Sequence, residues 1–296
     1  MYLLERRFND TDGFTNAAVD GVRLRMGWNK IQPTLNSAID WTEPDRAVAN
    51  AKKNGKQIKL GIAFLAAESN PTGFEEAGCK MVQLSIGKIP WINDPIFLRE
   101  AGKLIAALGT RYDGQVTAVV MGGLGVKNFE SHIANNPEDM AALDAAGGLD
   151  GWKNAVKEIT QLYNNAFPNT RFVFTAGLPY NNKDGEAALR EVIDFVAPKY
   201  GERFGLMNCA LNAESGPNYP PNELVTKYAP TNACGLQFLT NCATGFGGAT
   251  CKGTLQQVLD KGVEILKGKG DLEVYPKDAD NPANAQLFKD TSAKLK

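Results

Sequence analysis

Residues 21–28 read Gly-Val-Arg-Leu-Arg-Met-Gly-Trp, and this alternation is typical of a β-strand. Successive side chains of a strand point to opposite faces, so the run has two different faces. They carry Arg23, Arg25 and Gly27 on one side, and Leu24, Met26 and Trp28 on the other. In a closed sheet one set lines the interior and the other packs against helices, and the alternation leaves both assignments open.

Similar short apolar runs recur along the whole chain, and most are followed by a helical stretch. The predicted strands are 22–28, 57–64, 116–122, 171–176, 204–209, 235–240 and 271–275, with a weaker one at 2–8. The predicted helices are 44–54, 95–108, 149–166, 185–196, 254–266 and 284–295, with Gly55, Gly109 and Gly201 as helix stops. This alternation is typical of a parallel sheet built from βα units. We therefore predict an α/β fold, a (β/α)8 TIM barrel forming a single domain over residues 1–296.

An open doubly wound sheet would show the same alternation, but it usually carries a glycine-rich phosphate loop after its first strand. The cluster Gly122-Gly123-Leu124-Gly125 follows a strand and has some likeness to such a loop. The segment after it, 126–136, is polar and irregular rather than helical. A dinucleotide site is therefore not predicted, and we expect no cofactor.

Charge and composition argue against several classes of protein. The chain has 32 Lys and Arg against 33 Asp and Glu, without a basic stripe, so nucleic acid is not an expected partner. Apolar runs such as 116–121 are much shorter than the roughly 20 residues that cross a bilayer, so a membrane is not expected either. The single histidine, His132, and the lack of a Cys-x-x-Cys pair predict no metal site and no histidine-based hydrolase triad. Nothing in the sequence predicts an oligomeric state.

Two of the five cysteines, Cys242 and Cys251, bracket a glycine-rich loop that a disulfide could close, with unpaired thiols as the alternative. Disulfides persist mainly in extracellular or periplasmic proteins, so such a bond favours that location. The first residues, Met-Tyr-Leu-Leu-Glu-Arg-Arg, show no apolar segment of a signal peptide.

Three segments of the sequence resemble corresponding segments in one group of (β/α)8 barrels. They are residues 21–28 with Ile31-Gln32-Pro33 and Asp40-Trp41 after them, residues 90–95 (Pro-Trp-Ile-Asn-Asp-Pro) with 108–114, and residues 272–278 (Leu-Glu-Val-Tyr-Pro-Lys-Asp). With these, the chain resembles bacterial (β/α)8 glycoside hydrolases of clan A, which include β-galactosidase-like and cellulase-like barrels. The segments correspond to the passage from strand 2 to strand 3, the passage from helix 3 to strand 4, and the closing strand 8.

The resemblance implies a carbohydrate substrate at the carboxyl ends of the strands and hydrolysis by two carboxylates, which clan A places after strands 4 and 7. This chain departs from that pattern. Its fourth strand, 116–122, lacks the usual Asn-Glu ending, and its seventh carries Gln237 where a glutamate is expected.

Two glutamates are the nearest replacements. Glu130, in the loop after strand 4, is the predicted acid, with a surface glutamate as its alternative role. Glu273 interrupts the apolar closing strand and is the predicted base or stabiliser, with a salt bridge to Arg23 or Arg25 as its alternative. Strands 4 and 8 lie on opposite sides of a barrel, and a wide pair of carboxyls favours inversion.

Sugar rings stack on aromatic faces, and their hydroxyls bond to planar amides and charged groups. The predicted substrate-binding residues are Arg25, Trp28, Trp91, Asn128, His132, Tyr180, Asn208 and Gln237. Further amides follow the predicted strands at Asn181, Asn182, Asn212 and Asn241, and each asparagine has a turn-capping role as its alternative.

Three hypotheses follow. The leading one is a glycoside hydrolase-like enzyme acting on an oligosaccharide or polysaccharide. The second is a carbohydrate-binding barrel that has lost catalysis together with the strand 7 glutamate. The third is an aldolase-like or isomerase-like barrel, for which residues 245–248 would imitate a phosphate loop and Lys252 or Lys277 would supply a lysine.

Overall fold

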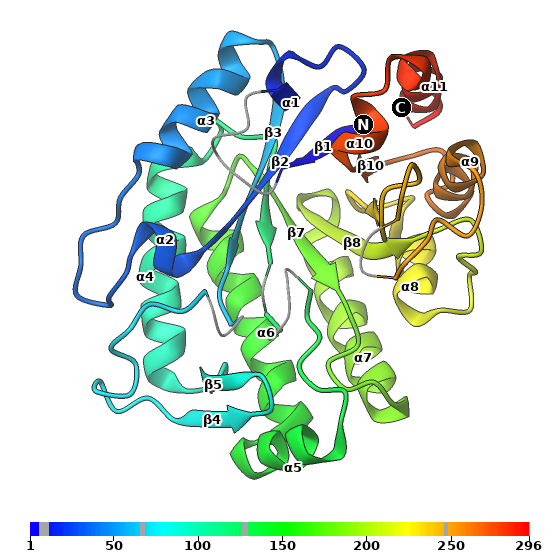
Figure 1. The fold of residues 1–296 in the computed structure, drawn as a ribbon. Helices are drawn as coiled ribbons and strands as arrows, with labels where there is room; N and C mark the ends of the chain where they lie inside the picture. The colour runs from blue at the N-terminus through cyan, green and yellow to red at the C-terminus, as the bar shows by residue number, and fades with distance from the viewer. Residues whose placement is uncertain (6–11, 66–68, 123, 126–129, 246–247, 296) are drawn as a thin grey trace.

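The barrel consists of eight parallel strands that close on themselves (Figure 1). The structure, a computed structural model, describes residues 1–5, 12–65, 69–122, 124–125, 130–245 and 248–295. In barrel order the strands are β1 (Tyr2–Glu5), β2 (Gly21–Gly27), β3 (Gln57–Ala63), β6 (Ala118–Met121), β7 (Arg171–Ala176), β8 (Phe204–Leu211), β9 (Gly235–Phe238) and β10 (Asp271–Val274). Each overlaps a predicted strand, so the predicted α/β fold, a (β/α)8 TIM barrel, is confirmed.

The first strand, which has the weakest sequence signal, closes the barrel. Tyr2 of β1 is in register with Gly21 of β2 on one side and with Glu273 of β10 on the other. Because β1 pairs on both sides, it leaves no open edge on the sheet.

Helices pack around the outside of the barrel, as Figure 1 shows. They are α1 (Asp12–Thr15), α2 (Trp28–Ile31), α3 (Thr42–Lys53), α4 (Pro95–Tyr112), α5 (Pro137–Ala146), α6 (Gly148–Ala166), α7 (Lys183–Tyr200), α8 (Pro220–Tyr228), α9 (Leu255–Ile265), α10 (Pro276–Ala279) and α11 (Ala285–Lys294), with 3-10 turns at Gly201–Arg203 and Pro282–Asn284. The short helix α8 was not predicted, because its Pro-Pro start suggests a loop, although proline fits the first turn of a helix. Within the described ranges, no helix is both long and apolar enough to span a bilayer.

One predicted helix stop is wrong. Gly109 lies inside α4, which continues to Tyr112. A Cβ added to Gly109 would lie 2.2 Å from the carbonyl oxygen of Ala166 on α6, so the glycine is required by close helix packing rather than by a turn. Gly55 and Gly201 do follow α3 and α7, with φ of 63° and 54°, as expected of residues that end helices.

The connection from β3 to α4 contains an antiparallel hairpin that was not predicted, formed by β4 (Met81–Leu84) and β5 (Gly87–Pro90). It lies beside α5 at one end of the molecule (Figure 1). Asp139 on α5 accepts hydrogen bonds from the backbone N–H and the hydroxyl of Ser85, both at 2.7 Å. These bonds fix the hairpin to the helical layer.

The structure decides which face of β2 points inward. Arg23 is fully buried and donates hydrogen bonds to Gln237 of β9 and Glu273 of β10, so the arginine face lines the barrel interior. Leu24 and Trp28 belong to the large apolar core between the strands and the helices. Next to the charged residues, the interior holds a small apolar cluster made of Ala118, Val173, Met207 and Cys209, and Arg23 contacts the sulfur of Met207 at 3.2 Å.

The loop after β9 is closed by the disulfide between Cys242 and Cys251, whose Cα atoms are 5.1 Å apart, so the proposed pairing is confirmed. The carboxylate of Asp278, at α10, accepts the N–H groups of Cys242 at 2.8 Å and Ala243 at 3.0 Å. Disulfide and carboxylate together hold this loop against the carboxyl end of β10.

Removing the disulfide is expected to lower the free energy of unfolding by about 2–3 kcal/mol, because a bond closing a sequence separation of 9 restricts the unfolded chain. Urea unfolding of the double variant Cys242→Ser/Cys251→Ser, without reductant, measures this change. Reductant added to the variant serves as the control and should have no further effect. Equal stability of the variant and the wild type would contradict the expectation.

Candidate functional site

Glu130 lies at the carboxyl end of the barrel, where barrel enzymes place their active sites. Its side chain packs against Gly177, the first residue after β7. A Cβ added to Gly177 would lie 3.3 Å from the Glu130 Cβ and 3.5 Å from its Oε2. The glycine therefore leaves room for the carboxyl group beside the strand end.

The segment after Glu130 runs alongside the segment after β7 and fixes its position. Ser131 Oγ donates to the carbonyl oxygen of Gly177 at 2.7 Å and accepts its N–H at 2.8 Å. The N–H groups of Ile133 and Ala134 both donate to the carbonyl oxygen of Pro179, at 2.9 and 3.0 Å. These bonds extend the pairing of the barrel strands into the loops, so Glu130 is held by backbone structure.

His132, which was predicted to bind substrate, belongs to the same segment. Its Nδ1 lies 2.7 Å from the carbonyl oxygen of Leu178, and its side chain is half-buried. The bond fixes the orientation of the imidazole. Asn128, the other residue predicted in this loop, lies outside the described residues.

The electrostatics of Glu130 suit a proton donor. Burial raises the pKa of its carboxyl above the usual range, and the charges of Arg23 and Arg25 act in the opposite direction without cancelling the effect. Burial, followed by the charge of Arg23, lowers the pKa of Arg25 to about 10. Both guanidinium groups stay cationic at neutral pH, so the charged form of Glu130 would be stabilised by two positive charges.

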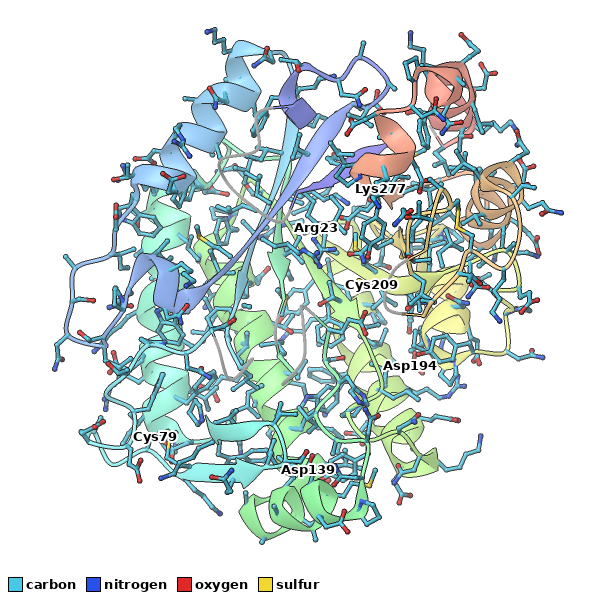
Figure 2. The ribbon with its side chains drawn as sticks, viewed as in Figure 1. Arg23, Cys79, Asp139, Asp194, Cys209 and Lys277 are labelled. Carbon is cyan, nitrogen blue, oxygen red and sulfur yellow. A yellow bond between two sulfur atoms is a disulfide. The ribbon has the colours of Figure 1, made fainter. Side chains whose placement is uncertain are left out.

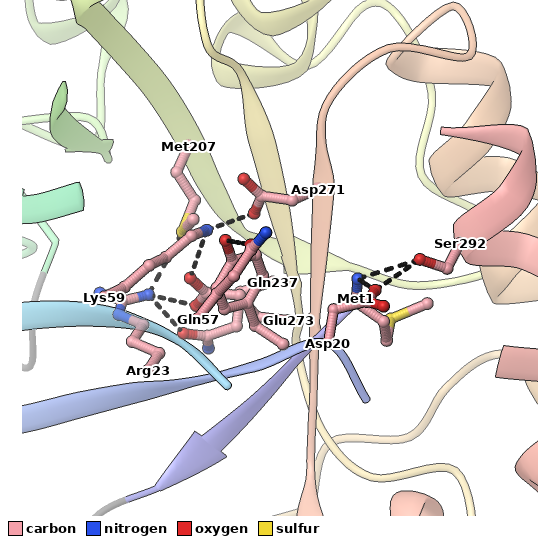
Figure 3. A network of polar contacts seen from close by, with 11 residues as sticks. Met1, Asp20, Arg23, Gln57, Lys59, Met207, Gln237, Asp271, Glu273 and Ser292 are labelled. Carbon is pink, nitrogen blue, oxygen red and sulfur yellow. Dashed lines mark hydrogen bonds and ion pairs between the residues drawn. The ribbon is translucent and has the colours of Figure 1, made fainter. Parts of the chain in front are cut away.

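Glu273 is not exposed at the mouth. Its side chain is fully buried, with Oε2 2.5 Å from Arg23 and Oε1 3.1 Å from Lys59, which also pairs with Asp271 (Figure 3). Burial alone would raise the pKa of Glu273, but the charges and hydrogen bonds of Arg23 and Lys59 outweigh it and keep the pKa below its usual range. The salt bridge with Arg23, which is the alternative role of Glu273, is present in the structure. The burial argues against the predicted role as base, because a carboxylate that attacks or deprotonates must reach substrate or water.

Gln237 belongs to the same interior network. It is in register with Glu273, and its Oε1 accepts a hydrogen bond from Arg23 at 3.1 Å. Arg23 and Cys209 both lie inside the barrel (Figure 2). The side-chain oxygen of Gln237 therefore already accepts a hydrogen bond within the protein, from Arg23.

The three predicted aromatic platforms are core residues. Trp28 is 1% exposed and makes edge contacts with Phe64 and Phe74, each at a centroid distance of 5.6 Å. Trp91 packs over Gly151, and the hydroxyl of Tyr180 donates to Asp144 at 2.8 Å. With ring faces covered by protein, none of them offers a surface for a sugar.

Asn208 points outward rather than into the mouth. It is buried, and its Nδ2 donates to Asn222 Oδ1 on α8 at 2.5 Å. Residues along β8 alternate between faces, and Cys209 is the neighbour that faces inward. The strand β8 continues to Leu211, two residues beyond the predicted end at 209. Asn208 therefore lies inside the strand, below the barrel mouth.

Sequence reasoning missed Tyr219, which lies in the loop between β8 and α8 with 41% of its surface exposed. Burial and then the charges of Glu130 and Cys209 raise the pKa of its hydroxyl. The tyrosine follows β8, the strand that pairs with β7, and Glu130 lies against Gly177 at the end of β7. An aromatic residue following strand 6 and preceding Pro220-Pro221 is the signal that could have identified it.

A cavity of about 550 Å³ opens at the other end of the barrel. Tyr2, Gln57, Arg171 and Asp271, at the amino ends of their strands, are among its lining residues. Barrel active sites lie at the opposite face, so this cavity is not the candidate site. In the part of the chain that the structure describes, no three or more His, Cys, Asp or Glu side chains are grouped so as to hold a metal ion.

No protein-family model and no curated protein sequence matches the chain. Similar structures include the catalytic domain of a β-amylase from Paenibacillus polymyxa, with a TM-score of 0.62, 10% identity, and coverage of 92% of this chain and 91% of that one. A psychrophilic family 10 endo-β-1,4-xylanase has a TM-score of 0.58 at 9% identity, covering 93% and 84%. A family 10 xylanase from Thermobacillus composti has a TM-score of 0.52 at 13% identity, covering 93% and 83%. The chain thus has the (β/α)8 fold of these glycoside hydrolases.

Proposed function

We propose that the barrel mouth binds an oligosaccharide or polysaccharide and that Glu130 donates a proton to the oxygen of a glycosidic bond. The observation that carries the proposal is the position of Glu130. It is half-buried against Gly177 at the carboxyl end of β7, the bonds of the neighbouring Ser131 fix its segment, and its pKa is raised. The similarity of the fold to β-amylase and xylanases supports a carbohydrate substrate.

The chemistry follows from the two charge states of Glu130. A raised pKa keeps the carboxyl protonated closer to neutral pH, which a general acid requires. As the proton moves to the leaving oxygen, the bond between that oxygen and the anomeric carbon breaks, and water adds to the carbon with loss of a proton to solvent. Glu130 is left as a carboxylate that the positive charges of Arg23 and Arg25 stabilise. The site therefore favours both holding the proton and accommodating the charge left behind.

Glu273 has a different role in this proposal. Its carboxylate and the side chain of Gln237 both accept hydrogen bonds from Arg23 and hold it inside the barrel. The charge of Arg23 in turn lowers the pKa of Glu130. Glu273 is thus a positioning residue, which acts through Arg23 and does not itself contact the substrate.

A second candidate function is carbohydrate binding without cleavage. The burial of Glu273 in an ion pair and the presence of Gln237 on β9 favour it, because hydrolysis by the usual route needs two accessible carboxyls. Both functions place a carbohydrate at the barrel mouth. They differ only in whether the bound carbohydrate is cleaved.

A panel of oligosaccharides and polysaccharides separates the two functions. Binding is measured by calorimetry and cleavage by release of reducing ends, for the wild type and Glu130→Gln. Glu138→Gln is the matched control, because Glu138 is an exposed glutamate in the first turn of α5, after the same strand. Release by the wild type and Glu138→Gln, but not by Glu130→Gln, supports the proposal. Binding without release by any of them favours the second candidate, and neither binding nor release refutes both.

A further inference from the structure

Tyr219 is one of three large hydrophobic side chains that the described residues leave exposed, with Phe195 and Leu239. Leu239 follows β9 and Phe195 lies on α7, an outer helix. Tyr219 differs from Phe195 in lying at the carboxyl end of the barrel, in the loop that follows β8. An aromatic ring that stays exposed at this rim has no part in the apolar core.

The loop that carries Tyr219 is held at both ends. The buried Asn222 donates to the carbonyl oxygen of Gly216 at 3.0 Å and accepts a hydrogen bond from Asn208 of β8 at 2.5 Å. Pro220 and Pro221 follow Tyr219 directly and restrict the backbone at the start of α8. The ring is consequently presented by a restrained backbone, which lowers the entropy lost when a ligand binds.

Tyr219 and Glu130 belong to adjacent parts of the rim. Glu130 lies against the end of β7, and Tyr219 follows β8, the strand that pairs with β7 from Phe172 to Ala176. The charge of Glu130 also contributes, after burial, to the raised pKa of the Tyr219 hydroxyl. The hydroxyl stays protonated at neutral pH and can donate a hydrogen bond.

We propose that Tyr219 is the platform on which a pyranose ring stacks beside Glu130, and that it selects sugars whose ring hydroxyls are equatorial. Such rings expose C–H groups on both faces, and these groups pack on an aromatic face while the hydroxyls bond at the edges. This inference rests on the proposed function and adds to it the class of sugar and the residue that recognises it.

The test measures binding of xylo- and cello-oligosaccharides by calorimetry to the wild type, Tyr219→Ala, Tyr219→Phe and Phe195→Ala. Loss of the ring should weaken binding about 10-fold. Tyr219→Phe keeps the stacking face and should bind within a few-fold of the wild type. Phe195→Ala removes an exposed ring (50% exposed) from α7, away from the mouth, and should bind like the wild type. Thermal melting of each variant checks that the fold is kept.

The outcomes separate this inference from the function on which it rests. Equal affinity of the wild type and Tyr219→Ala, in a protein that does bind these sugars, would overturn the platform and leave the carbohydrate site in place. Weakening in Tyr219→Phe as large as in Tyr219→Ala would overturn stacking in favour of the hydroxyl. A wild type that binds manno-oligosaccharides, with an axial hydroxyl, in preference to these would overturn the selectivity. Failure of the wild type to bind any carbohydrate would overturn both proposals.

Discussion

Glu273→Gln is expected to lower the free energy of unfolding by about 3–5 kcal/mol, because it removes the buried carboxylate that pairs with both Arg23 and Lys59. Arg23 and Glu273 are both 0% exposed, and Lys59 is 2% exposed. Lys59 keeps its ion pair with Asp271, whereas Arg23 loses its ion pair with Glu273. Urea unfolding of the variant and the wild type at neutral pH measures the difference.

The matched control for this variant is Glu264→Gln. Glu264 pairs with Lys261 on the surface, with 65% of its side chain exposed, and such pairs contribute less than about 1 kcal/mol. A loss for Glu273→Gln that is no larger than for Glu264→Gln would contradict the buried network.

The difference should also depend on pH. The pKa of Glu273 is lowered in the folded protein, so its contribution is present above the unfolded pKa of about 4.3 and is lost as the pH falls through the folded pKa. We therefore expect the stabilities of the wild type and Glu273→Gln to converge in acid. A constant difference down to low pH would assign the loss to packing instead of charge.

Glu130→Gln is expected to reduce hydrolysis by about 10²–10⁴-fold, because general acid catalysis contributes on that order. The rate of the wild type should fall as the pH rises through the pKa of Glu130, which burial raises above that of an ordinary glutamate. The amide has no proton to donate, so the variant should lack this alkaline limb. Initial rates of reducing-end release across pH measure both effects.

Stability separates a catalytic from a structural role for Glu130. Because its folded pKa is raised, its stabilising contribution is complete below the unfolded pKa of about 4.3 and is lost as the pH rises through the folded pKa. At neutral pH, Glu130→Gln should be at least as stable as the wild type. A variant that is both inactive and unfolded, or a rate that is unchanged, would contradict the assignment.

Most of the barrel could be predicted from the sequence, because strands and helices are specified by local periodicity. The run at 204–209 and the helix at 149–166 each overlap an element of the structure, β8 and α6. The hairpin β4–β5 was missed because its strands have four residues each and lie in a long connection between larger elements. Short segments of this kind depend on contacts such as that of Ser85 with Asp139.

The candidate site was predicted in part. Glu130 was identified from its place after strand 4, and the structure adds its contact with Gly177. Trp28 was assigned to the mouth because it ends a predicted strand, yet in the structure it begins α2 and packs against Phe64 and Phe74 in the apolar core. Proximity to a strand end does not fix the direction of a side chain, and the direction decides whether a ring binds ligand or fills the core.

The sequence by itself determined the order of strands and helices, because that order depends on residues that are close in the chain. It predicted the barrel from this order, and it offered a disulfide between Cys242 and Cys251 with unpaired thiols as the alternative. The structure decided both, through the pairing of β1 with β10 and the bond between the two cysteines. Only the tertiary structure decided that Arg23 faces inward and that Glu273, 250 residues away, neutralises it. Charge pairing inside a barrel depends on which strands become neighbours and in what register, and local periodicity carries no information about that.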